Sequence, residues 1–144
     1  MTRYLGIDFG TRRIGVAVSD ELGLTAQPLP SLEPSSEEEA IRAIRGLIEQ
    51  YGVLEVVVGL PKNMNGSLGP AAEQALAFAR RLEEGGAVKA TMWDERLTSR
   101  AAERLLIEAD LSRAKRKRHV DQMAAVLILQ GFLDRYHRQQ ERSL

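Results

Sequence analysis

Three consecutive valines, Val56-Val57-Val58, constrain the fold of this chain more than any other feature. A continuous β-branched run bounded by turn residues is typical of a central strand in a parallel or mixed sheet. Such a strand needs helices on both faces of its sheet. The run therefore predicts an α/β fold, because an antiparallel sheet with one wet face would show alternating polar residues instead.

The segments before and after this run predict the other strands. Residues 4–9, 14–18 and 24–29 are strand-like and are separated by tight turns, which indicates an antiparallel meander. We expect the third of these strands to be short and to end at its prolines. Residues 87–93 read as a last strand. The prediction is a mixed sheet of about five strands, in which the last two are parallel.

Four helices are predicted between and after these strands. Ser36 opens a capping box, and the helix that follows ends at Gly52. A proline at the first turn and a glycine pair at the end mark a second helix from Pro70 to Gly85-Gly86. The remaining helices are expected from Thr98 or Ser99 through Ala109, and from about His119 to about Tyr136.

The composition narrows the class of protein. The 144 residues fit one domain over 1–144, and 44% hydrophobic residues predict a globular chain. There are no cysteines and only two histidines, so a thiolate or His-rich metal centre is not expected. No signal peptide or membrane span is evident, and we expect a soluble cytoplasmic protein, monomer or homodimer, with no membrane partner.

Charge is distributed unevenly although its formal sum is zero. Residues 37–39 are acidic, whereas residues 113–118 are densely basic and lead towards Asp121. A zero net charge argues against a general polyanion binder, but a local basic patch still holds phosphates. We interpret residues 113–118 as a phosphate-binding connection between two helices. The alternative is a solvated loop.

Carboxylates occur at positions where an apolar residue would be expected. Asp8 interrupts the apolar residues 4–9, and Asp94-Glu95 follow the last strand. Asp121 shares a helical face with Ala124, Ala125, Ile128 and Phe132. Burying a carboxylate is costly unless something compensates its charge. A divalent cation such as Mg²⁺ compensates several carboxylates at once, which points to metal-assisted phosphodiester hydrolysis.

Each carboxylate also has a simpler interpretation. Asp8 could accept hydrogen bonds from backbone N–H groups at a strand end, and Asp121 could be an acid favoured by a helix N-terminus. Adjacent residues in an extended strand point to opposite sides, so only one of Asp94 and Glu95 should face Asp8. Glu95 is the preferred ligand because it reaches further, and Asp94 is the second choice.

Four motifs together resemble the YqgF/RuvX family. The first is the opening segment 5–17, with the sequence Leu-Gly-Ile-Asp-Phe-Gly-Thr-Arg-Arg-Ile-Gly-Val-Ala. The others are Val58-Gly59-Leu60-Pro61 with Asn63-Met64 and Gly66, then Asp94-Glu95-Arg96-Leu97-Thr98, then Val120-Asp121 with Ala124-Ala125-Val126. They cover essentially the whole chain in order. The departures are Lys62, Asn65, Ala101 and Gln122, none of which is a carboxylate of the expected site.

The resemblance implies a ribonuclease H-like fold and a metal-binding role for Asp8, the Asp94-Glu95 pair and Asp121. We expect a two-metal site for Mg²⁺ or Mn²⁺ in which Asp8 bridges both ions, while Glu95 and Asp121 hold one each. The loop 59–69 is expected to be flexible and to contact substrate, unless it is an ordinary connection. The residues expected to bind nucleic acid are Thr11, Arg12, Lys62, Asn63, Arg96, Lys115, Arg116 and Lys117.

The expected function is that of a metal-dependent nuclease, and more narrowly an endonuclease, acting on structured nucleic acid. The resemblance implies processing of the 5′ end of pre-16S rRNA, or alternatively cleavage of four-way DNA junctions as a Holliday junction resolvase. A third hypothesis is a catalytically silent nucleic-acid or ribosome-associated protein. The segment Gly6-Ile7-Asp8-Phe9-Gly10-Thr11 also resembles the phosphate loop of actin-like ATPases and sugar kinases, but those need two such domains.

Overall fold

The structure is a computed structural model. It describes residues 3–10, 12–63, 65–86, 88–94 and 113–142, with the backbone alone for residues 113–122 and 141–142. The strands are β1 (Arg3–Phe9), β2 (Ile14–Ser19), β3 (Ala26–Leu32), β4 (Val53–Leu60) and β5 (Lys89–Asp94). The helices are α1 (Glu37–Tyr51), α2 (Pro70–Glu83) and α4 (Arg113–Arg142).

The strands form one sheet in the order β3-β2-β1-β4-β5. β1, β2 and β3 are antiparallel neighbours, whereas β4 and β5 join β1 in parallel. Gly6 on β1 lies between Ala17 on β2 and Val57 on β4, which fixes the register across the middle of the sheet. The mixed five-stranded sheet predicted from the sequence is therefore confirmed.

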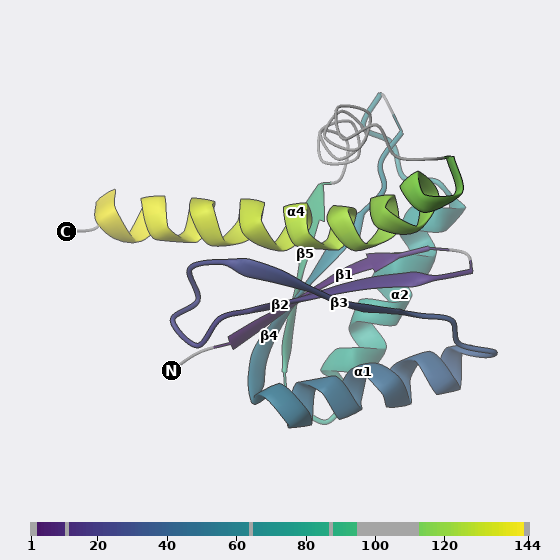
Figure 1. Cartoon of the computed structure of the whole chain (residues 1–144), viewed down its shortest axis with the longest axis horizontal. Coiled ribbons are helices and arrows are strands. Elements are labelled where there is room, and N and C mark those ends of the chain that lie inside the picture. The colour runs from purple at the N-terminus through teal and green to yellow at the C-terminus, as the bar shows by residue number, and fades with distance from the viewer. Residues whose placement is uncertain (1–2, 11, 64, 87, 95–112, 143–144) are drawn as a thin grey trace.

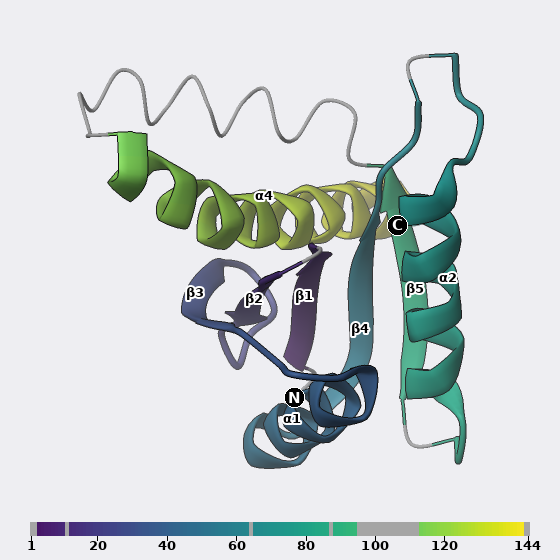
Figure 2. The ribbon, with the colours of Figure 1, turned by 90° about the vertical axis from the view of Figure 1, so that its right-hand side faces the viewer.

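Helices cover both faces of this sheet. α4 lies across one face, and α1 and α2 lie on the other (Figures 1 and 2). Side chains of β1 alternate between the two layers, as an extended strand requires. Leu5 and Ile7 enter the larger apolar cluster with α1 and α2, whereas Tyr4 packs beneath α4. Val56 and Val58 join the first cluster and Val57 the second, which explains the continuous valine run.

The Ser36 cap predicted for α1 is present, and Glu39 reaches back to the residue before the cap. Ser36 Oγ accepts a hydrogen bond from the Glu39 backbone N–H at 3.1 Å, and Glu39 Oε2 accepts one from the Ser35 N–H at 3.3 Å. Gly52 ends the helix with φ of +63°, a left-handed conformation that strains other residues. Local sequence therefore sets both ends of this helix.

Two predicted boundaries are wrong. Pro28 and Pro30 lie inside β3 rather than ending it, because β3 is an edge strand and one side of its backbone needs no partner. The basic segment 113–118 is the start of α4 and not a connection between helices. Alanine, lysine and arginine favour helix, so the helix extends beyond its apolar stripe. The helix expected from Thr98 or Ser99 through Ala109 lies outside the described residues.

Within the part of the chain that the structure describes, no helix combines the length and the apolar character needed to cross a bilayer.

Candidate active site

Asp8 lies near the carboxyl end of β1, on the face that α4 covers. It follows Gly6 by two residues, and Gly6 faces Ala125 and Leu129 of α4. The Asp8 side chain is half-buried. Among the described residues its carboxylate makes no hydrogen bond and no ion pair. The alternative in which backbone N–H groups satisfy Asp8 therefore finds no support in the described part of the chain.

The sheet around Asp8 lacks side chains on both neighbouring strands. Its partner on β2 is Gly15, and on β4 Gly59 follows Val58, the partner of Ile7. Glycine at both positions leaves the surface beside the carboxylate without Cβ atoms. A half-buried carboxylate with no partner among the described residues, set beside glycines, suits a hydrated divalent cation, which binds oxygen ligands and keeps several waters.

The path of α4 relates Asp121 to Asp8. The Tyr4 ring lies 5.6 Å from the Phe132 ring centroid, whereas Gly6 faces Ala125. Moving along β1 towards Asp8 therefore leads towards the start of α4, and Asp121 lies one helical turn before Ala125 (Figure 1). The backbone brings the Asp121 position to the same end of the sheet as Asp8. The Asp121 side chain is outside the described part of the structure.

The helix-dipole interpretation of Asp121 is also resolved by α4. The helix begins at Arg113, so Asp121 lies eight residues inside it. The favourable effect of a helix N-terminus on an acid falls off within the first turn. An interaction with the helix N-terminus therefore does not account for Asp121.

Asp94 is on the opposite face of the sheet from Asp8. Trp93 packs beneath α4, since a Cβ at Gly131 would lie 2.9 Å from Trp93 Cζ2. Met92 packs with the α1 and α2 cluster, so alternation puts Asp94 on that side as well. There, Asp94 Oδ2 lies 3.9 Å from Lys62 Nζ. Glu95, the preferred ligand, lies outside the described residues.

The loop after β4 is more ordered by hydrogen bonds than the sequence predicted. Gly59 and Leu60 belong to β4 itself. Lys62 and Leu68 pair through an isolated antiparallel β-bridge. The Asn63 backbone N–H donates to the Ser67 carbonyl at 3.0 Å, and Asn63 Nδ2 donates to Ser67 Oγ at 3.0 Å. The Asn63 amide therefore helps to close the loop. The neighbouring Lys62 side chain lies near the Asp94 carboxylate.

The remaining predicted contacts are only partly described. Arg12 is exposed in the turn between β1 and β2, and its guanidinium has no ion pair among the described residues. Lys115, Arg116 and Lys117 lie in the first turns of α4, where the structure gives the backbone alone. Thr11 and Arg96 lie outside the described residues. In the described part of the chain, no three His, Asp or Glu side chains gather as a metal site would require.

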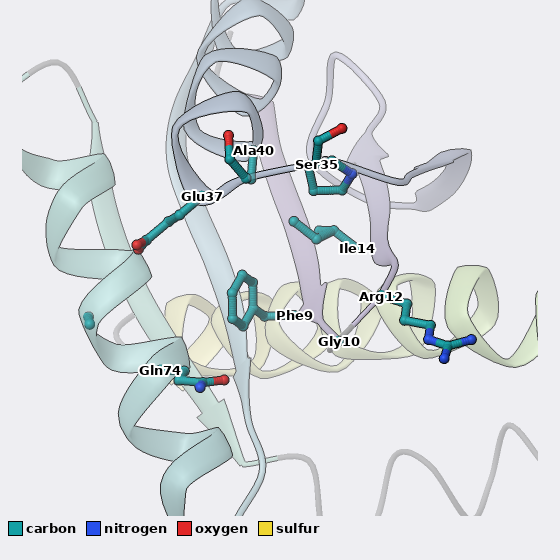
Figure 3. A pocket seen from close by; sticks show the side chains of 11 residues that line it. Phe9, Gly10, Arg12, Ile14, Ser35, Glu37, Ala40 and Gln74 are labelled. Carbon is teal, nitrogen blue, oxygen red and sulfur yellow. The ribbon is translucent and has the colours of Figure 1, made fainter.

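A pocket of about 410 Å³ beside Asp8 was not predicted from the sequence. It lies between the β1–β2 turn, the start of α1 and the middle of α2, and Figure 3 shows it from close by. Phe9 and Ile14 form its apolar wall, and Gln74 and Glu37 its polar rim. No single motif predicts it, because its residues come from three separate stretches of the chain, 9–14, 34–40 and 74–77. The only local signal is alternation, which turns Phe9 away from Asp8.

A family model described as "RuvX: Holliday junction resolvase" matches residues 2–135. A protein from Geobacillus kaustophilus is 52% identical over 134 residues, which cover 92% of this chain and 97% of the relative. One from Bacillus cereus strain B4264 is 54% identical over 135 residues, or 92% and 98% of the two chains. Both relatives carry the name "Putative pre-16S rRNA nuclease".

Two solved structures share the fold. Thermus thermophilus RuvC, in complex with a Holliday junction substrate, superposes with a TM-score of 0.56 at 18% identity and covers 94% of this chain and 96% of its own. The Fowlpox virus resolvase with junction DNA gives 0.61 at 9% identity, with 94% and 99% covered. At these identities the likeness shows the fold, which is the ribonuclease H-like fold of the RuvC resolvases.

Proposed function

This chain belongs to the RuvX family and is a nuclease, and we propose that it processes the 5′ end of pre-16S rRNA with a divalent metal ion. The observation that carries the substrate is the identity of 52–54% to relatives of that name, over almost their whole length. The fold-level likeness to junction resolvases is weaker evidence for substrate, because one fold hosts many functions.

The residues present fit a metal ion. Asp8 offers a half-buried carboxylate that has no partner among the described residues, and glycine on both neighbouring strands leaves room for a hydrated cation. Oxygen donors without histidine or cysteine suit Mg²⁺ or Mn²⁺. When bound, such ions would lower the pKa of a coordinated water and offset charge on the phosphate.

Asp8, Asp121 and Glu95 are the proposed ligands. Asp8 and the Asp121 position share one end of the α4-covered face, from β1 and α4 respectively. Glu95 is favoured over its neighbour, since Asp94 lies on the far face and contacts Lys62. In this proposal Asp94 anchors the loop after β4 through Lys62, and Glu95 supplies the third carboxylate.

Basic side chains would hold the phosphates that flank the cleaved bond. Arg12 is exposed in the β1–β2 turn that follows Asp8. Lys115, Arg116 and Lys117 precede Asp121 on α4 by about one to two helical turns. Arginine and lysine bind phosphate oxygens without reading sequence. Aromatic residues make up only 5% of the chain, so recognition through the backbone and shape of the RNA is favoured over general base stacking.

The test compares two substrates under one condition. Purified protein with Mg²⁺ or Mn²⁺ is given a precursor rRNA fragment that carries its 5′ extension, and a four-way DNA junction of matched length. We expect faster cleavage of the RNA and none with Asp8→Asn. Preferential cleavage of the junction would identify a resolvase instead. Binding without metal-dependent cleavage of either substrate would identify a silent nucleic-acid-binding protein.

A further inference from the structure

The pocket beside Asp8 opens on the other side of the same strand end. Adjacent residues of β1 point to opposite faces, so Asp8 faces α4 while Phe9 faces α1 and α2. Gly10 comes next, and it is exposed and lacks a side chain. A Cβ there would lie 2.5 Å from the Arg13 carbonyl oxygen, so the turn is too tight for a side chain at this position. A nucleic-acid strand can cross from one face to the other over Gly10.

The walls of the pocket suit a flat heterocycle. Phe9 packs on Phe78 with ring centroids 4.7 Å apart, yet it still lines the pocket, as does Ile14. The rim is polar and includes Gln74, whose amide has no hydrogen bond among the described residues. An amide offers a donor and an acceptor together, as the edge of a nucleobase does. Small-molecule sites combine apolar walls and a few polar groups in this way.

The charged groups at the rim suit a nucleotide rather than a free anion. Glu37 lines the pocket and is held by Arg81, with Nη1 3.3 Å from Glu37 Oε2, so part of the rim is acidic. Arg12 also lines the pocket, its side chain extends away from Phe9 (Figure 3), and it has no ion pair within the described residues. A phosphate bound by Arg12 at the mouth would leave its base to enter between Phe9 and Gln74.

We propose that this pocket binds one unpaired nucleobase of the substrate strand. The base belongs to a nucleotide next to the phosphodiester bond that is cleaved at Asp8. The proposal rests on the proposed nuclease function and deepens it, because it names an unpaired nucleotide beside the cleavage position as part of the substrate. The bound base would lie on the α1 and α2 face of the sheet. Holding it there would fix which phosphodiester bond lies beside Asp8 on the α4 face.

Ala77 offers a way to close the pocket without touching the carboxylates. It is exposed on α2 and lines the pocket, so Ala77→Leu would fill part of the space. Ala71 is also an exposed alanine of α2 but does not line the pocket, which makes Ala71→Leu the matched control. Both changes keep a good helix former, so folding should survive in both.

The experiment uses single-stranded RNA oligonucleotides in which each position in turn is made abasic. Affinity is measured with Asp8→Asn protein and cleavage with Asp8 intact, in each of the Ala77 and Ala71 backgrounds. We expect one position at which losing the base lowers affinity and cleavage about tenfold. In Ala77→Leu, affinity and cleavage should be about as low with intact RNA as wild type shows at the sensitive abasic position, and removing that base should cause no further loss. Ala71→Leu should behave as wild type.

The possible failures are distinguishable. Metal-dependent cleavage with no sensitive position would overturn the base pocket and leave the nuclease proposal intact. A sensitive position that persists unchanged in Ala77→Leu would also overturn it, since the base would then bind elsewhere. If RNA is neither bound nor cleaved, the proposed function itself fails, and the pocket proposal with it.

Discussion

The two faces of the sheet use the same strand for different purposes. On the face of α1 and α2, β1 presents Leu5 and Ile7, which are fully buried in the larger apolar cluster. On the face of α4, it presents Gly6, which has no side chain, and then Asp8, whose carboxylate has no partner within the described part of the chain. Stability is concentrated on the first face, and the proposed chemistry on the second.

Close approach explains why the α4 face can carry a site. A Cβ at Gly6 would lie 2.7 Å from Leu129 Cβ and 3.0 Å from the Ala125 carbonyl oxygen, so the helix backbone lies almost on the strand. That distance brings the Asp121 position near the end of β1. On the other face, Leu5 and Ile7 of β1 are large apolar side chains that fill the space beneath α1 and α2.

The strongest contrast should come from neighbouring residues of β1. Asp8→Asn keeps the shape of the side chain but removes its charge, so we expect cleavage to fall about a thousandfold or more with little loss of stability. Ile7→Ala should instead cost about 2–5 kcal/mol of unfolding free energy. Cleavage rates and urea unfolding of both variants test this. An Asp8→Asn protein that cleaves like wild type would end the site assignment.

The acidic pair at the end of β5 sharpens the comparison. Glu95→Gln should lower cleavage more than Asp94→Asn, because Asp94 lies on the far face and contacts Lys62. Losing that contact should loosen the loop after β4 and leave metal binding intact. Single-turnover rates at saturating Mg²⁺ separate the two variants. If Asp94→Asn is the more damaging change, Asp94 is the ligand and the face argument does not hold.

The basic start of α4 should affect binding rather than metal affinity. Replacing Lys115, Arg116 and Lys117 with Gln removes phosphate contacts, which weakens binding and lowers the salt slope by up to about one unit per lost contact. Arg135→Gln with Arg138→Gln, both exposed near the far end of α4, is the control. Binding is titrated at several salt concentrations. An unchanged slope in the triple variant would mean that these side chains are merely solvated.

Two glycines give the smallest expected effects and opposite signs. Gly6→Ala should destabilise the fold by about 1–3 kcal/mol, because the new methyl group collides with α4. Gly46 lies in α1 with nothing within 4 Å of an added Cβ, so Gly46→Ala should stabilise by about 0.5–1 kcal/mol. Thermal melts of both variants give the comparison. Equal shifts would show that α4 does not press on β1 as described.

The sequence predicted those features that short segments determine. The valine run gave the central strand, and the Ser36 cap and Gly52 gave the ends of α1, because a few neighbouring residues decide each. The start of α4 was missed because the basic residues there favour helix without any apolar period. The third strand, predicted over 24–29, was expected to end at its prolines, because its position at the sheet edge is a property of the whole topology.

In the candidate site, too, single residues could be picked out from the sequence, whereas their surroundings could not. Asp8 stood out because it interrupts an apolar strand, but the glycines beside it belong to two other strands and are matched to it only by the sheet register. The phosphate contact expected of Asn63 stays a prediction, and no local pattern indicated that its amide also donates to Ser67 across the loop. The pocket needed α1 and α2 to meet beside Phe9, which only tertiary packing decides.

Metal binding tests the central claim most directly, because it does not depend on the substrate. Isothermal titration calorimetry with Mn²⁺ is carried out on wild type, Asp8→Asn and Asp94→Asn under one buffer condition. The account predicts that wild type and Asp94→Asn bind Mn²⁺ with similar affinity and that Asp8→Asn loses this binding. Unchanged Mn²⁺ binding by Asp8→Asn would contradict the claim that Asp8 is the centre of a metal-dependent active site.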